Sequence, residues 1–199
     1  MECRSAGKRY PVSARLRIHR SEKQKEYVFW KYKQLKNLVT TGPRRIKAGH
    51  DKKRNTDWFS WYFHTKTLEE LGTLYHWLYQ DEVKILPLDV FEFLTPRALA
   101  IWFMDDGSNT KESYTISTHC FSIQELRITD FFKRKYGIAA TIVKDRSKFK
   151  IAIRRHEYKK LNTIIEPYII PSMIYKICNP RNDLFPLEAG RMKQTRITS

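Results

Sequence analysis

An apolar segment that runs into two adjacent acids constrains the fold of this chain more than any other feature. Residues 98–108 read Ala-Leu-Ala-Ile-Trp-Phe-Met-Asp-Asp-Gly-Ser, so seven apolar residues precede Asp105, Asp106 and Gly107. This pattern predicts a buried helix that ends on a carboxylate, where a metal ion or a strong cationic partner makes the charge tolerable. A core helix with a solvated, glycine-terminated end is the alternative interpretation.

The charge balance indicates a polyanionic partner. The chain has 38 Lys and Arg against 21 Asp and Glu, a formal net charge of +17. Nucleic acid and an anionic membrane are the candidate polyanions, but a membrane protein needs a basic amphipathic helix or a long apolar span, and the sequence has neither. The N-terminus also lacks the apolar core of a signal peptide. The sequence therefore predicts a soluble, intracellular protein without membrane contact, in a bacterial cytoplasm or an organelle matrix.

Cysteine and histidine do not indicate a metal or redox site. The three cysteines are far apart and form no Cys-x-x-Cys pair, and the six histidines show no ligand spacing. A disulfide framework, a structural zinc site and a histidine-based nuclease motif are therefore not supported. With 199 residues, 41% of them hydrophobic, the chain is long enough for one or two compact domains.

The predicted elements occur in the same order in both halves, which favours two similar units over one irregular domain. In the first half they are a strand at 12–19, a helix from 21 to near 42, a hairpin at 44–48 and 58–64, a helix at 67–78, and Lys84. In the second half they are the helix 96–106, a strand at 114–119, a helix at 122–136, a hairpin at 139–144 and 149–154, a helix at 156–165, and Lys176.

These residues together resemble the LAGLIDADG homing endonucleases, most closely the single-chain branch with two repeats. Residues 99–107 align with the nine-residue family signature, and Thr95, Pro96 and residues 167–176 fit that branch. The resemblance implies an α+β fold of two αββαββα pseudo-repeats with curved antiparallel sheets. The first repeat would span 1–92 and the second 93–185, with its signature helix at 96–107, followed by a basic tail at 186–199. The polar, basic composition of residues 181–199 predicts that they are poorly ordered.

The resemblance also implies the roles of the site residues. Asp106 matches the metal-binding acid, and Asp105 and Gly107 would support it at the helix end. Lys84 and Lys176 match the lysines near each active centre, which would orient water or stabilise the phosphate charge. The expected cofactor is Mg²⁺ or Mn²⁺. From composition alone, a lysine in so basic a chain is more often a solvated charge, and only the equivalent positions in the two halves argue otherwise.

Basic residues on the predicted strands are expected to contact double-stranded DNA. They would project from one side of the two sheets and contact phosphates or base edges. These candidates are Arg15, Arg17 and His19 in the first unit, and Lys144, Lys148, Lys150 and Arg154 in the second. The aromatic residues at 58–63 alternate too densely to indicate stacking on bases, and we expect them in the core.

The first unit has no counterpart of the helix 96–106. Two explanations are open: the helix lies upstream of residue 1, or a second copy of the chain fills the interface, with self-association through helix 96–106. The leading prediction is a site-specific, Mg²⁺-dependent DNA endonuclease encoded by a mobile intron. The alternatives are a nuclease-inactive DNA- or RNA-binding protein, such as a maturase acting on intron RNA, and a basic protein of a ribonucleoprotein. The missing acid leaves the activity of the chain by itself open.

Overall fold

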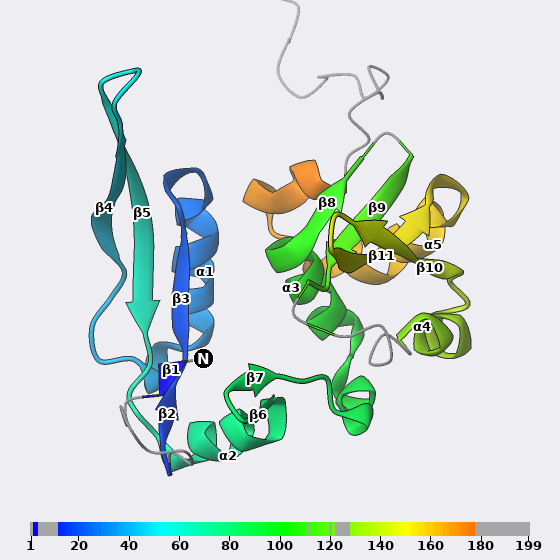
Figure 1. Ribbon diagram of the computed structural model, residues 1–199, viewed down its shortest axis with the longest axis horizontal. Helices are drawn as coiled ribbons and strands as arrows, with labels where there is room; N and C mark the ends of the chain where they lie inside the picture. The colour runs from blue at the N-terminus through cyan, green and yellow to red at the C-terminus, as the bar shows by residue number, and fades with distance from the viewer. Residues whose placement is uncertain (1, 4–11, 111, 120, 122–127, 178–199) are drawn as a thin grey trace, which may run out of the picture.

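Two antiparallel sheets, each with helices on one face, make up the computed structural model (Figure 1), which describes residues 2–3, 12–110, 112–119, 121 and 128–177. The first sheet has the order β3-β5-β4 and the second the order β10-β11-β9-β8. The strands of the two sheets are β3 (Arg17–Ser21), β4 (Arg44–Asp51), β5 (Thr56–His64), β8 (Gly107–Asn109), β9 (Ser113–Ser117), β10 (Ala140–Asp145) and β11 (Lys148–Arg154).

Five α-helices and two short strand pairs connect and cover the sheets in the described part of the chain. The helices are α1 (Lys25–Gln34), α2 (Glu69–Leu78), α3 (Pro96–Asp106), α4 (Ile128–Tyr136) and α5 (Tyr158–Ile165). The strand pairs are β1 (Glu2–Cys3) with β2 (Ala14–Arg15), and β6 (Tyr79–Gln80) with β7 (Val83–Lys84). Short 3-10 helices lie at Glu22–Gln24, Lys36–Leu38, Leu88–Phe93, Arg155–Glu157, Glu166–Tyr168 and Pro171–Lys176.

The predicted repetition is visible in the strand order. In each sheet the second strand of a hairpin lies in the centre, between its hairpin partner and the strand that precedes the hairpin. The α+β prediction is confirmed, and β8 is an added edge strand that the sequence did not indicate. Part of the helix expected at 122–136, the end of the second repeat and the tail 186–199 lie outside the described residues.

Two boundaries of the first unit differ from the prediction. The strand expected at 12–19 is divided at Leu16, whose amide donates to the Thr65 hydroxyl oxygen (3.0 Å) and not to a neighbouring strand. The helix expected from 21 begins only at Lys25, after a 3-10 turn, and ends at Gln34. The division at Leu16 depends on a contact with Thr65, 49 residues along the chain, which apolar periodicity does not encode.

The core of the second unit holds α3 in place. Thr95 caps the helix by accepting a hydrogen bond from the Ala98 amide (3.2 Å), and Pro96 occupies the first turn, where a missing N–H costs nothing. Leu99 and Phe103 are fully buried, and the Phe103 ring packs edge-to-face on Tyr114 with centroids 5.3 Å apart. The spacing of four residues puts both side chains on the helix face that points into this core.

A second face of α3 packs against the first unit. Tyr27 of α1 forms a buried cluster with Met104 and Met173. At the other end of the contact, Arg97 donates to the Gln34 side-chain oxygen (2.6 Å). Part of the apolar surface of α3 is therefore covered within the chain itself, by α1.

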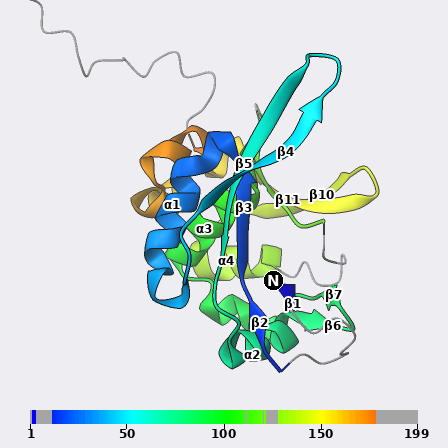
Figure 2. The same ribbon diagram turned by 90° about the vertical axis from the view of Figure 1, so that its left-hand side faces the viewer.

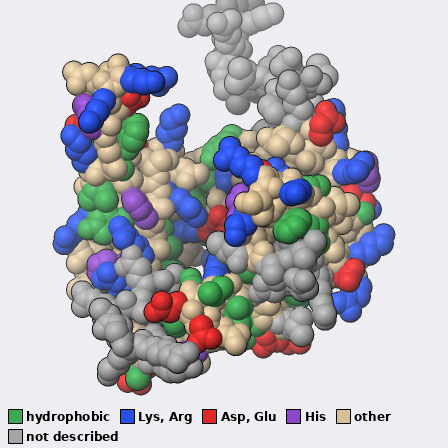
Figure 3. Space-filling view, in the orientation of Figure 1, with side chains coloured by type: hydrophobic (Ala, Val, Ile, Leu, Met, Phe, Trp, Pro, Cys, Tyr) green, Lys and Arg blue, Asp and Glu red, His purple; other side chains and the backbone are tan. Residues whose placement is uncertain are grey.

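The two hairpins extend toward the same side of the molecule, away from α1 (Figure 2). The β4–β5 hairpin is the longer one, and it carries a β-bulge between Lys47 and Gly49. Lys and Arg side chains lie on both units, on either side of a central hollow (Figure 3). This side of the molecule is the one toward which both sheets turn the faces that their helices do not cover.

Candidate active site

Asp106 is the last residue of α3, and the chain turns directly after it into β8. Its side chain is exposed, whereas Gly107 is buried. The Gly107 amide donates to the Phe103 carbonyl, and a Cβ at position 107 would overlap the Phe103 carbonyl oxygen and ring. Glycine is needed here because of this close approach, and it allows an acid to stand at the helix end while the chain enters the sheet.

Two lysines lie near Asp106. Lys176, in the last 3-10 helix, is buried, and its ammonium donates to the Met104 carbonyl (2.6 Å) at the end of α3. Lys84 comes from β7, and its ammonium stands 5.5 Å from the centre of the Phe121 ring. The structure thus brings together three residues that the sequence analysis singled out from different segments of the chain.

The electrostatics of Asp106 reflect these neighbours. Desolvation by the surrounding protein raises the pKa of Asp106, and the adjacent Asp105 carboxylate raises it further. Arg20, Lys84 and Lys176 oppose this increase. Burial lowers the pKa of Lys176, and the charge of Arg20 acts in the same direction. Because the pKa of Asp106 is raised, a bound cation would stabilise its carboxylate form.

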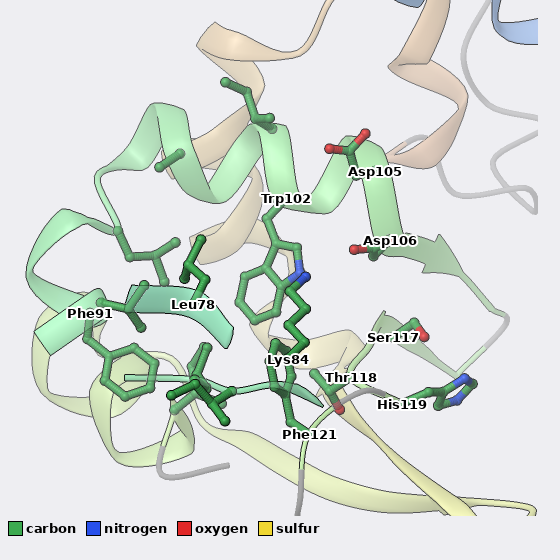
Figure 4. Close-up of a pocket in the computed structure, with 17 residues that line it drawn as sticks. Leu78, Lys84, Phe91, Trp102, Asp105, Asp106, Ser117, Thr118, His119 and Phe121 are labelled. Atoms are coloured by element: carbon green, nitrogen blue, oxygen red, sulfur yellow. The ribbon is translucent and has the colours of Figure 1, made fainter. Parts of the chain in front are cut away.

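Asp106 lies at one side of a cavity of about 510 Å³ (Figure 4). Lys84, Ser117, Thr118 and His119 provide polar groups on this side, and the opposite part is apolar. On α3, the lining residues are Ala98, Ile101, Trp102, Asp105 and Asp106, which follow one face of the helix for its whole length. The apolar part of the lining also includes Leu78, Ile85, Leu86, Val90, Phe91 and Leu94.

Asp105 is engaged by two cations of the first unit. Both of its carboxylate oxygens lie 2.7 Å from the Lys31 ammonium, and one accepts from Arg20 at 2.5 Å. Burial by itself would raise the pKa of Asp105, but the ion pairs with Lys31 and Arg20 outweigh it and hold the pKa below its usual value. The sequence predicts a supporting role for Asp105 at the helix end and identifies neither Lys31 nor Arg20 as its partner.

The site offers one carboxylate, that of Asp106, as a ligand for a divalent metal ion, and the described residues do not complete a coordination sphere. Among the residues that the structure describes, no three His, Cys, Asp or Glu side chains lie together as a metal-binding group. Lys31 and Arg20 occupy the oxygens of Asp105. Asp106 lines the same cavity and forms no ion pair with another described residue. A hard cation such as Mg²⁺ takes such an oxygen together with waters and phosphate oxygens.

The first sheet presents part of the predicted DNA-contacting set. Arg17 and His19 lie opposite His64 and Tyr62 in the β3–β5 register, on the sheet face away from α1. The Arg17 guanidinium stands 5.4 Å from the centre of the Tyr62 ring. Arg15 lies in β2 and lines a smaller cavity next to His64.

Two residues on the same face were missed by the sequence analysis. Arg44 lies opposite Tyr62 in β4, and Trp58 projects from β5 over Gly49 with 54% of its surface exposed. The expectation that Trp58 belongs to the core is therefore wrong. The signal that could have found both residues is the alternation along the hairpin, since Trp58 and Tyr62 have the same parity on β5.

On the second sheet, the prediction of one shared basic face is correct for three residues and wrong for the fourth. Lys148, Lys150 and Arg154 alternate along β11 with the buried Ile151 and Ile153, so they lie on the face away from the core. Lys144 lies opposite Phe149 in the β10–β11 register, on the other face. Residues that are directly paired on adjacent strands lie on the same face of the sheet. Lys144 therefore lies on the face of Phe149, opposite to Lys148, Lys150 and Arg154.

Comparison with known proteins decides the family. The model of the LAGLIDADG DNA endonuclease family matches residues 6–161. The chain belongs to this family. The resemblance stated from the sequence is thereby confirmed.

The curated proteins that this chain resembles include both endonucleases and a maturase. The intron-encoded endonuclease ai4 of Dictyostelium discoideum is 34% identical over 139 residues, which cover 67% of this chain and 84% of the relative. DNA endonuclease I-ChuI of Chlamydomonas applanata is 31% identical, with 80% of this chain and 81% of the relative covered. The cytochrome b mRNA maturase bI2 of Saccharomyces cerevisiae is 35% identical, but the match spans 59% of this chain and 30% of that protein.

A solved structure shares the fold. The homing endonuclease I-WcaI bound to its DNA recognition sequence superimposes with a TM-score of 0.75 at 24% identity, with 82% of this chain and 75% of that chain covered. In the described part of the chain, no helix has the length and apolar character needed to cross a membrane. The LAGLIDADG fold predicted from the sequence is confirmed by this comparison.

Proposed function

We propose that this LAGLIDADG protein is a site-specific endonuclease that hydrolyses phosphodiester bonds in double-stranded DNA with Mg²⁺ or Mn²⁺. The observation that carries the proposal is the position of Asp106, an exposed acid at the end of a buried helix, between two basic sheets and beside two lysines. The net charge of +17 agrees with a polyanionic substrate. The intracellular location predicted from the sequence stays a prediction.

Asp106 is the residue that would hold the metal. A divalent cation, when bound to this carboxylate, supplies an activated water near neutral pH and neutralises phosphate charge. The raised pKa of Asp106 means that the free carboxylate is desolvated, so a cation there replaces lost hydration. Asp105 is held by Lys31 and Arg20 and keeps a separate role.

Lys84 and Lys176 would act on the phosphate and on the attacking water. Lys176 is anchored by its hydrogen bond to the Met104 carbonyl, which fixes its ammonium at the turn that carries Asp106. Lys84 reaches the polar side of the cavity, where Asp106 lies, from an exposed hairpin. Cations held at fixed positions stabilise developing negative charge without reorganising at the moment of reaction.

Binding would use the uncovered faces of both sheets. Arg17 and His19, with Arg44 beside them, would contact one part of the site, and Lys148, Lys150 and Arg154 would contact the other. Arg15 remains a candidate at the edge of the first sheet. Contacts to phosphates would fix the register of the protein, and contacts to base edges would read the sequence.

Cleavage of both strands needs a second acid, and we propose that a second copy of the chain supplies it. The cavity beside α3 is lined by Ala98, Ile101, Trp102 and Asp105, which form a continuous helix face of the kind on which another helix packs. Two copies paired through helix 96–106 would bring two Asp106 carboxylates together. Sedimentation velocity of the wild type and of Ala98→Arg tests this pairing, and a monomeric wild type that cuts both strands would overturn it.

A nuclease-inactive protein that binds DNA or intron RNA is the second candidate. The maturase relative, at 35% identity, favours it, as does the lack of a group of three metal-binding side chains among the residues that the structure describes. Such a protein would keep the basic sheet faces and would not depend on Asp106. The two candidates therefore differ in the effect of one substitution.

The test is a cleavage and binding assay with a randomised DNA library. Wild type should cut selected sites with Mg²⁺ and not with excess chelator. Asp106→Asn should abolish cutting and leave binding intact, because it removes a charge and keeps the shape. Asp130→Asn is the matched control, since Asp130 is an exposed acid on α4, outside the site. Binding of DNA or RNA without cutting under any metal condition would overturn the endonuclease and favour the second candidate.

A further inference from the structure

Asp105 joins the two units by an ion-pair cluster at the catalytic end of α3. Its partners come from two elements of the first unit, Arg20 from β3 and Lys31 from α1. Its neighbour Tyr27 is fully buried in the same contact, and burial followed by the Asp105 charge raises the pKa of Tyr27. The side chains are shielded as well, with 10% of Lys31 and 20% of Asp105 exposed.

Removing either the Asp105 carboxylate or one of its two cationic partners should destabilise the contact between the two units. The Lys31 ammonium is close to both Asp105 oxygens, and the Arg20 guanidinium adds a third contact. Loss of Asp105 would leave two cations facing each other in a partly buried contact. Two further polar contacts join α1 and α3 among the described residues: the Tyr27 hydroxyl donates to the Ile101 carbonyl (3.4 Å), and Arg97 donates to Gln34 (2.6 Å) at the opposite end of α3.

Arg20 connects this cluster to the outer face of the first sheet. It occupies β3 directly after His19, and neighbouring residues of a strand point to opposite faces. His19 therefore lies on the uncovered face while Arg20 reaches under the sheet to Asp105. On the helix, Asp105 directly precedes Asp106. The contact between Arg20 and Asp105 therefore links the strand that carries His19 to the helix end that carries Asp106.

We propose that Asp105 is a positioning residue that fixes strand β3 against the end of α3 and thereby sets the spacing between the DNA-facing side of the first sheet and Asp106. The inference rests on the proposed function in one respect, since it takes Asp106 as the acid that must meet the scissile phosphate. A misplacement of about 1 Å at such a centre costs on the order of 100-fold in rate. Binding by each sheet would be affected far less, because each sheet keeps its own core.

The test measures the arrangement of the units directly. Spin labels on unnatural amino acids at the exposed Asn37 and Lys159 report one distance between the first and second units. We expect Asp105→Asn and Lys31→Met to shift or broaden the distance distribution. Lys160→Met is the matched control, because it removes a Lys–Glu pair with Glu157 (2.8 Å) inside the second unit, and it should leave the distribution unchanged.

A charge exchange separates positioning from simple loss of stability. The double variant Asp105→Lys with Lys31→Asp restores an attraction between the same two elements, and we expect it to recover the wild-type distribution at least in part. An unchanged distribution in both single variants would overturn the proposal. So would a failure of the exchange to move a folded protein back toward the wild-type distance.

Cleavage on the same variants distinguishes this proposal from the proposed function. On a selected DNA site, the single variants should lose about 100-fold in single-turnover rate with little change in affinity, and the exchange should regain rate. If the distance changes while the wild type cuts no DNA, the link between the units stands and the endonuclease proposal fails. If the wild type cuts and the variants cut equally fast despite a changed distance, Asp105 does not position the catalytic acid.

Discussion

Replacing Phe103 by alanine should destabilise the protein more than the same change at its neighbour Trp102. Phe103 is fully buried and packs edge-to-face on Tyr114 in the core of the second unit. Trp102 is only partly buried and lines the cavity beside α3. Substitution of Phe103 tests the face of α3 that packs in the core, and substitution of Trp102 tests the face that borders the cavity.

The expected magnitude follows from burial and from the cavity that the substitution leaves. Removing a fully buried Phe side chain costs about 3–5 kcal/mol, including the loss of the aromatic pair. For a chain of this size, that is a decrease in Tm of about 6–20 °C. Trp102→Ala should cost clearly less, because water already reaches part of its indole ring.

Urea denaturation followed by circular dichroism measures both free energies of unfolding. Comparable slopes with denaturant concentration would show that the variants unfold the same structure. The reasoning fails if Phe103→Ala unfolds within about 1 kcal/mol of wild type, since that lies below the range for a buried ring. It also fails if Trp102→Ala is as costly as Phe103→Ala.

Three further outcomes follow from the site. Because desolvation and Asp105 raise the pKa of Asp106, metal-dependent cleavage should decline with falling pH in a higher pH range than for an ordinary Asp, and a pH series of cleavage rates measures this. The effect on folding has the opposite sign: the contribution of Asp106 to stability is present below its unfolded pKa and is lost as pH rises through its folded pKa, which unfolding at several pH values measures. Lys176→Met should reduce the single-turnover rate by about 100-fold with affinity nearly unchanged, because the anchored ammonium is replaced by an apolar group of similar length. Arg154→Ala should reduce the slope of log affinity against log salt by about one, whereas Lys144→Ala, on the other sheet face, should leave it unchanged; equal slopes would contradict the assigned faces.

The sequence predicted α3 and its surroundings well because the relevant signals are local. The unbroken apolar run at 98–104, the two acids after it and the following glycine all act within one helix. The equivalent positions of Lys84 and Lys176 were visible because the order of elements is repeated. The signals within the helix can be recognised in the sequence because they involve residues only a few positions apart.

Contacts across the two units were not predictable in the same way. Lys31 and Arg20 lie 74 and 85 residues from Asp105, and nothing in a basic sequence distinguishes them from other cations. The wrong face for Lys144 has a related cause, because strand parity in a hairpin depends on the turn register, here with Arg146 at positive φ. A shift of one residue reverses the face of every side chain on the strand.

The partial cover of α3 by α1 is likewise a tertiary effect. Tyr27 is a fully buried aromatic residue in a helix that also carries Val28, Phe29, Trp30 and Tyr32, and it is buried against Met104 and Met173 of distant segments. Periodicity within α1 gives little indication of this contact. The assembly of the site therefore depends on pairings that become visible only in three dimensions.

The most direct test of the central claim is to count the metal ions held by the DNA complex. Electron paramagnetic resonance of Mn²⁺, titrated into the protein on a selected DNA site, measures bound metal independently of the cleavage rate. We predict that wild type and Asp130→Asn bind Mn²⁺ equally, and that Asp106→Asn loses a bound ion while still binding the DNA. Equal Mn²⁺ stoichiometry and affinity in the Asp106→Asn complex would contradict the assignment of Asp106 as the metal-binding acid.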